Sequence, residues 1–168
     1  AEIRIGLPEL EDTQMGPVVS RRQYDRVMQY NEAGKKEGAK LVRGEGTVPQ
    51  HGYFVDITVF DEVRHGMTIE REEIFAPVMG ILAWYDEAEM LREVNDTEYG
   101  LCANIWTNDI ATGLRMADAV EAGYVWINGH GNKRFKGAPF GGFKSSGIGR
   151  EHSLDELLSY TQIKNVNV

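Results

Sequence analysis

The sequence has few of the residues that mark secreted, metal-binding or nucleic-acid-binding proteins. Its one cysteine cannot form an internal disulfide, which favours a reducing, cytoplasmic setting. Its four histidines stand singly, with no second cysteine or histidine at ligand spacing, so the sequence predicts no metal site. The net charge of -8 disfavours nucleic acid, because a phosphate-binding face needs clustered Lys and Arg.

Long apolar segments are also missing. The longest apolar runs, such as residues 77–85, are far shorter than the roughly 20 residues of a membrane span. No basic stretch followed by an apolar one opens the chain, so the sequence predicts no secretory signal. What remains is the composition of a globular protein, with 42% hydrophobic and 26% charged residues among 168. That length suits one domain with a sizeable core.

Helices and strands are predicted to alternate along the chain. Ser20 and Gln23 fit a capping box that opens a helix, and Asp86 and Asp109 are predicted to begin two more. Strands are predicted over residues 39–42, 53–60, 101–106 and 124–127, the last of them central. A last helix around Leu154 is followed by an extended segment. This order indicates an α/β fold, with helices layered on a largely parallel sheet.

A glycine-rich loop, PFGGFKSSGIGR at residues 139–150, precedes the last helix. Its backbone N–H groups could hold a phosphate at the start of a helix. It is not a P-loop, because Phe143 stands where the lysine would be. The favoured local interpretation is a tight connection that needs glycines in left-handed conformations. Anion binding stays open as the alternative.

The segment EEIF at residues 72–75 has two interpretations. Adjacent acids before an apolar residue are most often a solvated helix end. A carboxylate beside an aromatic ring can also hold a ribose diol while the ring packs on a flat heterocycle. Pro77 favours extended backbone before it, which places Phe75 at a junction between loop and strand.

Cys102 has apolar neighbours and no cation near it in sequence. A reactive thiolate needs positive charge or a helix N-terminus close by. We therefore expect Cys102 to be a small, buried strand residue and not a nucleophile.

Taken together and in order, several segments resemble the C-terminal part of the catalytic domain of aldehyde dehydrogenases. They are TQMGP at 13–17, EEIF at 72–75, VWIN at 125–128, PFGGFKSSGIGRE at 139–151 and YTQIK at 160–164. The resemblance covers essentially the whole chain and is closest to the broad group that includes betaine aldehyde dehydrogenases. It implies residues 1–158 as part of that catalytic domain and residues 159–168 as an oligomerisation strand.

The resemblance also implies roles for individual residues. In the family, NAD or NADP accepts a hydride as an aldehyde is oxidised to a carboxylate. By position, Glu73 would accept hydrogen bonds from the nicotinamide ribose and Phe75 would pack beside the nicotinamide. Phe140 would line the aldehyde channel, and Asn128, with the residues up to 137, would shape its mouth. Arg150 would be a structural ion-pair residue near a dimer interface.

Other catalytic parts of the family lie upstream of the matched region: the nucleophilic cysteine, the general base, the oxyanion-hole asparagine and the nucleotide-binding domain. We therefore expect this chain to be inactive alone and to form a homo-oligomer through residues 160–168. Local departures, such as Ala76 for a usual glycine, put the substrate class in doubt. The loop at 129–135 lacks the aromatic cage that a quaternary ammonium prefers.

Two rival hypotheses belong to other classes of protein. One is a non-catalytic α/β module that binds an anion or a protein partner through the loop Gly141 to Arg150. The other is a purely structural subunit. A Gly-Gln-x-Cys stretch shortly before Ala1 would decide for the enzyme.

Overall fold

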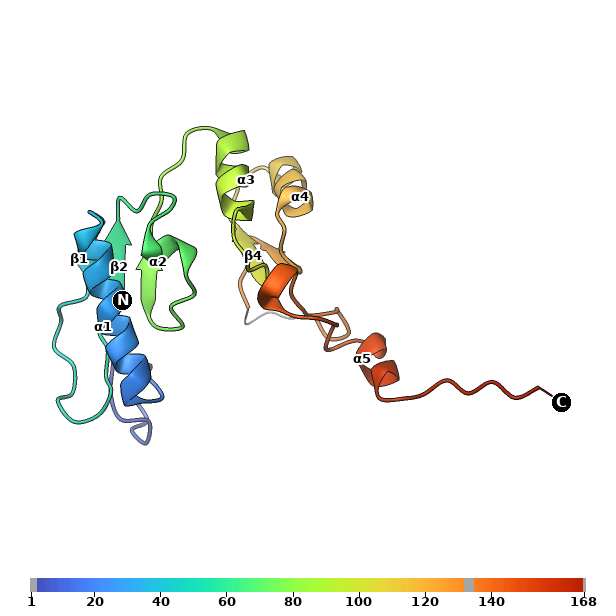
Figure 1. The fold of residues 1–168 in the computed structure, drawn as a ribbon, viewed down its shortest axis with the longest axis horizontal. Helices are drawn as coiled ribbons and strands as arrows, with labels where there is room; N and C mark the ends of the chain where they lie inside the picture. The colour runs from blue at the N-terminus through green and yellow to red at the C-terminus, as the bar shows by residue number, and fades with distance from the viewer. Residues whose placement is uncertain (1–2, 132–134, 168) are drawn as a thin grey trace. The chain divides into compact units, whose positions relative to one another are not determined.

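The computed structural model describes residues 3–131 and 135–167, and the chain divides into two compact units, Ala1–Tyr85 and Asp86–Val168 (Figure 1). The first unit holds a three-stranded sheet in the order β1, β2, β3. The central strand β2 pairs antiparallel with β1 and parallel with β3. The strands are β1 (Lys40–Arg43), β2 (Thr58–Asp61) and β3 (Val78–Gly80), and the helices are α1 (Arg21–Lys36) and α2 (Thr68–Arg71).

The core of the first unit lies where α1 and α2 meet the sheet. Phe60 of β2 is fully buried and clusters with Tyr30 of α1 and Ile69 of α2. Gly34 makes this close packing possible. A Cβ atom there would lie 3.0 Å from Ile69 Cδ1 and 3.2 Å from Phe60 Cζ. Because real Cβ atoms rarely come so close to a neighbour, a side chain at this position would require the Ile69 and Phe60 side chains to shift.

The second unit contains one parallel strand pair joined through a helix. The strands β4 (Cys102–Ile105) and β5 (Tyr124–Ile127) pair in parallel. Between them runs α4 (Ile110–Ala119), which contacts both strands. This strand–helix–strand arrangement is the crossover unit expected of an α/β chain. The unit also has α3 (Glu87–Asn95), a 3₁₀ turn (Lys144–Ser146) and α5 (Leu154–Ser159).

The predicted helix starts are confirmed. Ser20 Oγ accepts from the Gln23 N–H at 3.2 Å, and Asp86 and Asp109 accept from N–H groups in the first turns of α3 and α4. The α/β class is confirmed too, but the sheets are only partly parallel, because β1 runs antiparallel to β2.

Two strand predictions were wrong in detail. The strand predicted over residues 53–60 pairs only from Thr58 onward. Asp56 accepts from the N–H groups of Gly46 and Ile57, so its side chain satisfies backbone donors where a sheet neighbour otherwise would. The strand at 124–127 is not central: among the described residues it pairs with β4 alone.

The segment after α5 is extended, as predicted, and Figure 1 draws it in red running to the C-terminus. Residues 161–167 form no strand pairing within the part of the chain that the structure describes. Within that same part, no helix has the length and apolar character needed to cross a membrane.

Candidate functional site

Residues 72–75 form a short loop between α2 and β3, and the loop turns two side chains outward. Ile74 is buried in the core of the first unit, with 8% of its surface exposed. Its neighbours Glu73 and Phe75 are exposed, and the Phe75 ring keeps 80% of its surface accessible. Phe75 has a φ of 59°, in the left-handed region. That conformation costs a residue with a side chain about 1 kcal/mol or more.

One face of α1 holds this loop in place. The side-chain amide of Gln23 donates to the carbonyl oxygens of Ile74 at 2.9 Å and Phe75 at 3.1 Å. Arg26 donates more weakly to the Glu73 carbonyl at 3.4 Å. These bonds join residues about 50 positions apart, and they hold the loop in the strained conformation that exposes the Phe75 ring.

The two adjacent acids have different environments. Glu72 accepts a hydrogen bond from the Tyr30 hydroxyl at 2.6 Å, and Arg26 donates to that hydroxyl at 2.7 Å. Burial, and then the hydrogen bond to Glu72, raise the pKa of Tyr30 above its usual 10.0, against an opposing effect of Arg26. The Glu73 carboxylate has no hydrogen-bond or ion-pair partner among the described residues. Glu72 is therefore a structural acid, and Glu73 is an open acceptor.

This arrangement suits a nucleoside. An ionised carboxylate accepts hydrogen bonds from both hydroxyls of a ribose, and an exposed ring can pack on a flat heterocycle. Glu73 and Phe75 are two positions apart on one anchored loop. The loop thus exposes a carboxylate and an aromatic ring, the two kinds of group that such contacts use.

The predicted substrate-side residues lie in the second unit. Asn128 follows β5 with a φ of 53°, and its side-chain amide bonds to the backbone N–H and carbonyl of Thr107, both at 2.9 Å. The amide thereby ties the ends of the parallel strands together. Phe140 is half-buried, with ring centroids 5.6 Å from Tyr124 and 5.8 Å from His152. Of the predicted channel mouth, residues 132–134 lie outside the described residues.

Arg150 contacts the backbone of the glycine-rich loop. Its guanidinium donates to the carbonyls of Gly142 at 3.1 Å and Gly149 at 2.7 Å, and it lies over the Phe143 ring at 5.6 Å. Within the described residues no carboxylate lies at ion-pair distance from it. Its ion pair at a subunit interface stays a prediction.

The glycine-rich loop packs against the rest of the second unit. The N–H groups of Phe143 and Ser145 donate to the carbonyls of Gly100 and Glu98, at 2.8 and 2.9 Å. Lys144 donates to the Asn95 carbonyl and pairs with Glu121, both at 2.6 Å. These donors are therefore occupied and not free to cradle an anion. Gly147 and Gly149 have positive φ angles of 135° and 84°, as the tight-connection interpretation predicts.

The prediction that Cys102 is buried was wrong. The thiol is exposed in the described structure, at the first position of β4. The side chains of β4 alternate between exposed and half-buried, and Cys102 falls on the exposed face with Asn104. The apolar residues next to Cys102 in sequence indicated a strand, but they did not indicate which of its two faces would be buried.

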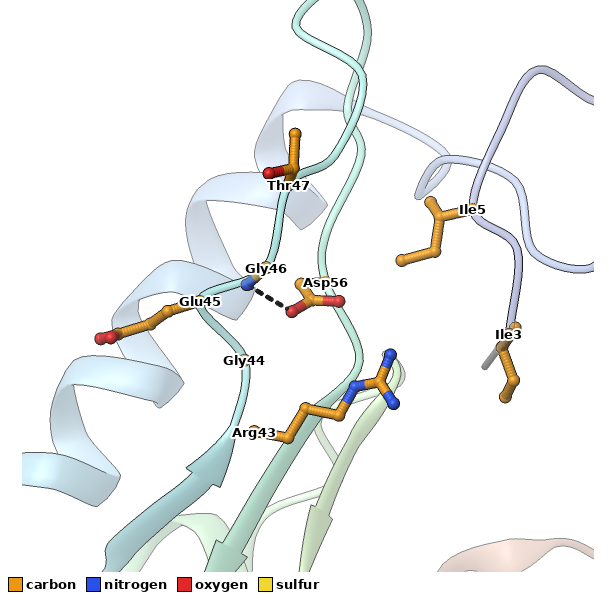
Figure 2. A pocket seen from close by; sticks show the side chains of 8 residues that line it. All are labelled: Ile3, Ile5, Arg43, Gly44, Glu45, Gly46, Thr47 and Asp56. Carbon is orange, nitrogen blue, oxygen red and sulfur yellow. Dashed lines mark hydrogen bonds between the residues drawn. The ribbon is translucent and has the colours of Figure 1, made fainter. Parts of the chain in front are cut away.

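A separate pocket of about 400 Å³ opens in the first unit, lined by Ile3, Ile5, Asp56 and the turn from Arg43 to Thr47 (Figure 2). The Asp56 carboxylate braces that turn by accepting from the Gly46 N–H at 2.7 Å. None of the predicted site residues lines this pocket.

The chain matches the profile described as the aldehyde dehydrogenase family over residues 1–166. It is 50% identical to a betaine aldehyde dehydrogenase of Brucella anthropi, covering 99% of this chain and 35% of that protein. It is 47% identical to the aldehyde dehydrogenase tropH of Talaromyces stipitatus, covering 98% and 33%. Because the family profile matches nearly all of its residues, the chain belongs to the aldehyde dehydrogenase family.

Solved structures agree. An aldehyde dehydrogenase of Bacillus cereus in complex with NAD+ superposes with a TM-score of 0.90 at 44% identity, covering 96% of this chain and 33% of that one. The NAD+ complex of a Mycobacterium tuberculosis aldehyde dehydrogenase gives 0.87 at 38% identity, covering 95% and 33%. The chain thus spans about one third of the length of these relatives.

The anchoring residues of α1 were not predicted as part of a site. Gln23 was assigned to a capping box, and the structure confirms only half of that motif, the bond from its backbone N–H to Ser20. Its side chain instead reaches the loop at residues 74–75. Nothing in the local sequence signals a contact between positions 51 apart.

Proposed function

We propose that this chain is part of a longer NAD(P)+-dependent enzyme that oxidises an aldehyde to a carboxylate. The observation that carries this proposal is the anchored loop, with the Glu73 carboxylate open and the Phe75 ring exposed. Membership of the aldehyde dehydrogenase family supports it, and so do the NAD+ complexes of similar structures.

The cofactor supplies the hydride acceptor when it is bound. Glu73 accepts hydrogen bonds from the ribose hydroxyls, and Phe75 packs beside the nicotinamide. The two residues orient the ring, because a sugar held by one contact and a base held by another cannot rotate freely. Holding reactants in a productive orientation can lower a barrier by several kcal/mol.

On the substrate side, Phe140 lines the aldehyde channel and Asn128 shapes its mouth. The two hydrogen bonds between the Asn128 side chain and the Thr107 backbone hold the start of the loop that follows β5. The sequence of that loop offers no aromatic cage for a quaternary ammonium. The proposal therefore names an aldehyde and not betaine aldehyde in particular, although a relative of that name is 50% identical.

The chain by itself is expected to be catalytically silent. Its one thiol, Cys102, lies in the second unit at the start of β4. The resemblance assigns the nucleophile, the general base and the nucleotide-binding domain to upstream sequence. The longer enzyme assembles through residues 160–168, and Arg150 forms a structural ion pair near that interface.

The test is an assay of the polypeptide encoded by the complete reading frame that contains this chain. We expect aldehyde-dependent reduction of NAD+ or NADP+, with the 168-residue chain as the silent comparison. A panel of aliphatic and aromatic aldehydes, each with both cofactors, identifies the preferred pair. A folded, complete polypeptide that reduces neither cofactor with any aldehyde would refute the proposal.

A further inference from the structure

The conformation of the loop at residues 72–75 is not determined by the loop alone. Phe75 is a non-glycine residue in the left-handed region, and the residue that follows, Ala76, precedes a proline. Left-handed backbone is unfavourable for residues with side chains and persists where surrounding contacts hold it. The contacts that hold this loop therefore decide where the Phe75 ring points.

Those contacts come from one face of α1, made of Gln23, Arg26 and Tyr30, at the spacing of three and four residues that places side chains on one side of a helix. The three side chains reach successive parts of the loop. Tyr30 donates to the Glu72 carboxylate, Arg26 to the Glu73 carbonyl, and Gln23 to the carbonyls of Ile74 and Phe75. We call these three residues the anchoring face.

Gln23 stands out within the anchoring face. Its side-chain nitrogen reaches two consecutive carbonyl oxygens, and these belong to Ile74 and to Phe75 itself. An amide nitrogen has two hydrogens, so both bonds can form at once. Because consecutive carbonyls normally point in different directions, a donor that engages both selects one conformation of the peptide between them.

We propose that Gln23 is a positioning residue for the cofactor: it fixes the left-handed conformation of Phe75 and so sets the orientation of the ring that packs beside the nicotinamide. This inference rests on the proposed function for the identity of the ligand, but the control of the loop by Gln23 is independent of it. Gln23 acts through the backbone of residues 74 and 75, without itself contacting the reacting atoms.

The first experiment measures the loop in the 168-residue chain. Gln23→Leu keeps the side-chain size and removes both donors. In hydrogen–deuterium exchange followed by mass spectrometry, the peptide covering residues 72–78 should exchange faster, on the order of tenfold at its protected sites. Those sites are the Glu72 and Val78 N–H groups, which donate to the Thr68 and Ala76 carbonyls and lose protection when the loop is no longer held by Gln23. Gln29→Leu is the matched control, since Gln29 is an exposed residue of the same helix with no partner among the described residues. Its loop exchange should equal that of the wild type.

The second experiment uses the complete enzyme. Gln23→Leu should lower kcat by about tenfold or more with a smaller change in the KM for the aldehyde, because a misplaced nicotinamide slows hydride transfer more than substrate binding. Gln23→Glu, which presents a carboxylate to two carbonyl oxygens, should be at least as slow. The melting temperature of each variant is measured alongside. A merely structural role would lower it and leave kcat of the folded enzyme unchanged.

The outcomes separate the two proposals. Unchanged loop exchange in Gln23→Leu would overturn the positioning role whatever the enzyme does. Faster exchange with unchanged kcat in an active enzyme would overturn it too, because the loop would then move without consequence for the nicotinamide. A complete polypeptide without dehydrogenase activity would refute the proposed function, while the exchange experiment would still decide whether Gln23 holds the loop.

Discussion

At the scale of residues, neighbours in sequence take unlike roles because the backbone turns them in different directions. Glu72 and Glu73 have the same side chain, yet the Glu72 carboxylate accepts a hydrogen bond from Tyr30 and the Glu73 carboxylate has no partner among the described residues. Ile74 points into the core and Phe75 away from it. Such assignments depend on a few backbone angles, so substitutions of adjacent residues should have separable effects.

Glu73→Gln tests the open acceptor in the complete enzyme. Replacing the carboxylate by an amide weakens a charge-assisted bond to the ribose, worth roughly 1.5–3 kcal/mol. We expect turnover to fall about tenfold or more, with a raised KM for the cofactor. Steady-state kinetics checks this, with Glu9→Gln as an exposed control without a partner among the described residues. Unchanged cofactor kinetics would contradict the ribose contact and favour the interpretation of Glu73 as part of a solvated helix end.

Gly123→Ala tests a close approach in the second unit. A Cβ atom at Gly123 would lie 1.8 Å from the Gly141 carbonyl oxygen, so the backbone of the glycine-rich loop would have to move. We expect a loss of at least about 2 kcal/mol in the free energy of unfolding, measured by denaturant titration. Gly131→Ala is the control, because the nearest atom to its Cβ would be 4.0 Å away. Equal stability of the two variants would contradict the geometry.

At the scale of elements, the helices α1, α3 and α4 each begin at a residue whose side chain caps them. Ser20, Asp86 and Asp109 each accept a backbone N–H at the start of a helix, and each was predicted from sequence alone. A cap needs only one side chain and the two or three residues after it. Local sequence therefore specifies it without help from the fold.

Asp109 links one of these caps to pH. The Thr112 hydroxyl, then the N–H groups of Ala111 and Thr112, hold the pKa of Asp109 below its usual 3.8. A depressed pKa means that the stabilisation is fully present above the unfolded value and is lost as pH falls through the folded one. The melting temperature of the wild type should therefore fall below about pH 4, in part through this group.

Asp109→Asn should flatten that acid decline, because asparagine caps a helix without titrating. The two proteins should melt at similar temperatures near pH 7 and diverge in steepness below about pH 4. Asp118→Asn, an exposed residue of the same helix, should follow the wild type throughout. Parallel pH profiles of wild type and Asp109→Asn would show that the cap does not titrate in this range.

At the scale of the whole molecule, the chain leaves much apolar surface uncovered. Leu154, Leu157 and Leu158 of α5 are between 53% and 67% exposed. Ile163 and Val166 in the extended segment are exposed as well, and that segment has no strand partner within the described residues. Surfaces of this kind are pairing sites for another chain.

We expect the 168-residue chain to form a dimer or larger species through residues 160–168. Light scattering at tens of micromolar, with and without those residues, checks this. Deletion should shift the population toward monomer, because it removes the unpaired extended segment. A monomeric intact chain, or an oligomer indifferent to the deletion, would contradict the prediction.

The same chain should give no aldehyde-dependent NADH or NADPH above a blank. Aldehyde oxidation in this family needs an activated thiolate beside the nicotinamide. The family resemblance assigns that thiolate to upstream sequence, and Cys102, although exposed, stands at the start of β4. Turnover that Cys102→Ser abolishes would show that this thiol is the nucleophile after all.

Sequence determined the features that depend on neighbours or on an ordered set of motifs. Caps at Ser20, Asp86 and Asp109, the α/β class, and membership of the aldehyde dehydrogenase family all follow from such local signals. Glu73 and Phe75 were also identified as candidate site residues from a short segment, EEIF. The pairing of a carboxylate with an aromatic ring can be recognised there from the sequence alone.

Tertiary structure decided what depends on distant partners. In the fold, the Tyr30 hydroxyl donates to Glu72, and the Gln23 side chain donates to a residue 51 positions away. The fold also leaves Cys102 exposed. It also made β1 antiparallel to β2 and occupied the N–H groups of Phe143 and Ser145 in the glycine-rich loop. These outcomes depend on which surfaces meet when strands and helices pack. A hydrogen bond between residues far apart in the chain has no local sequence pattern that would predict it.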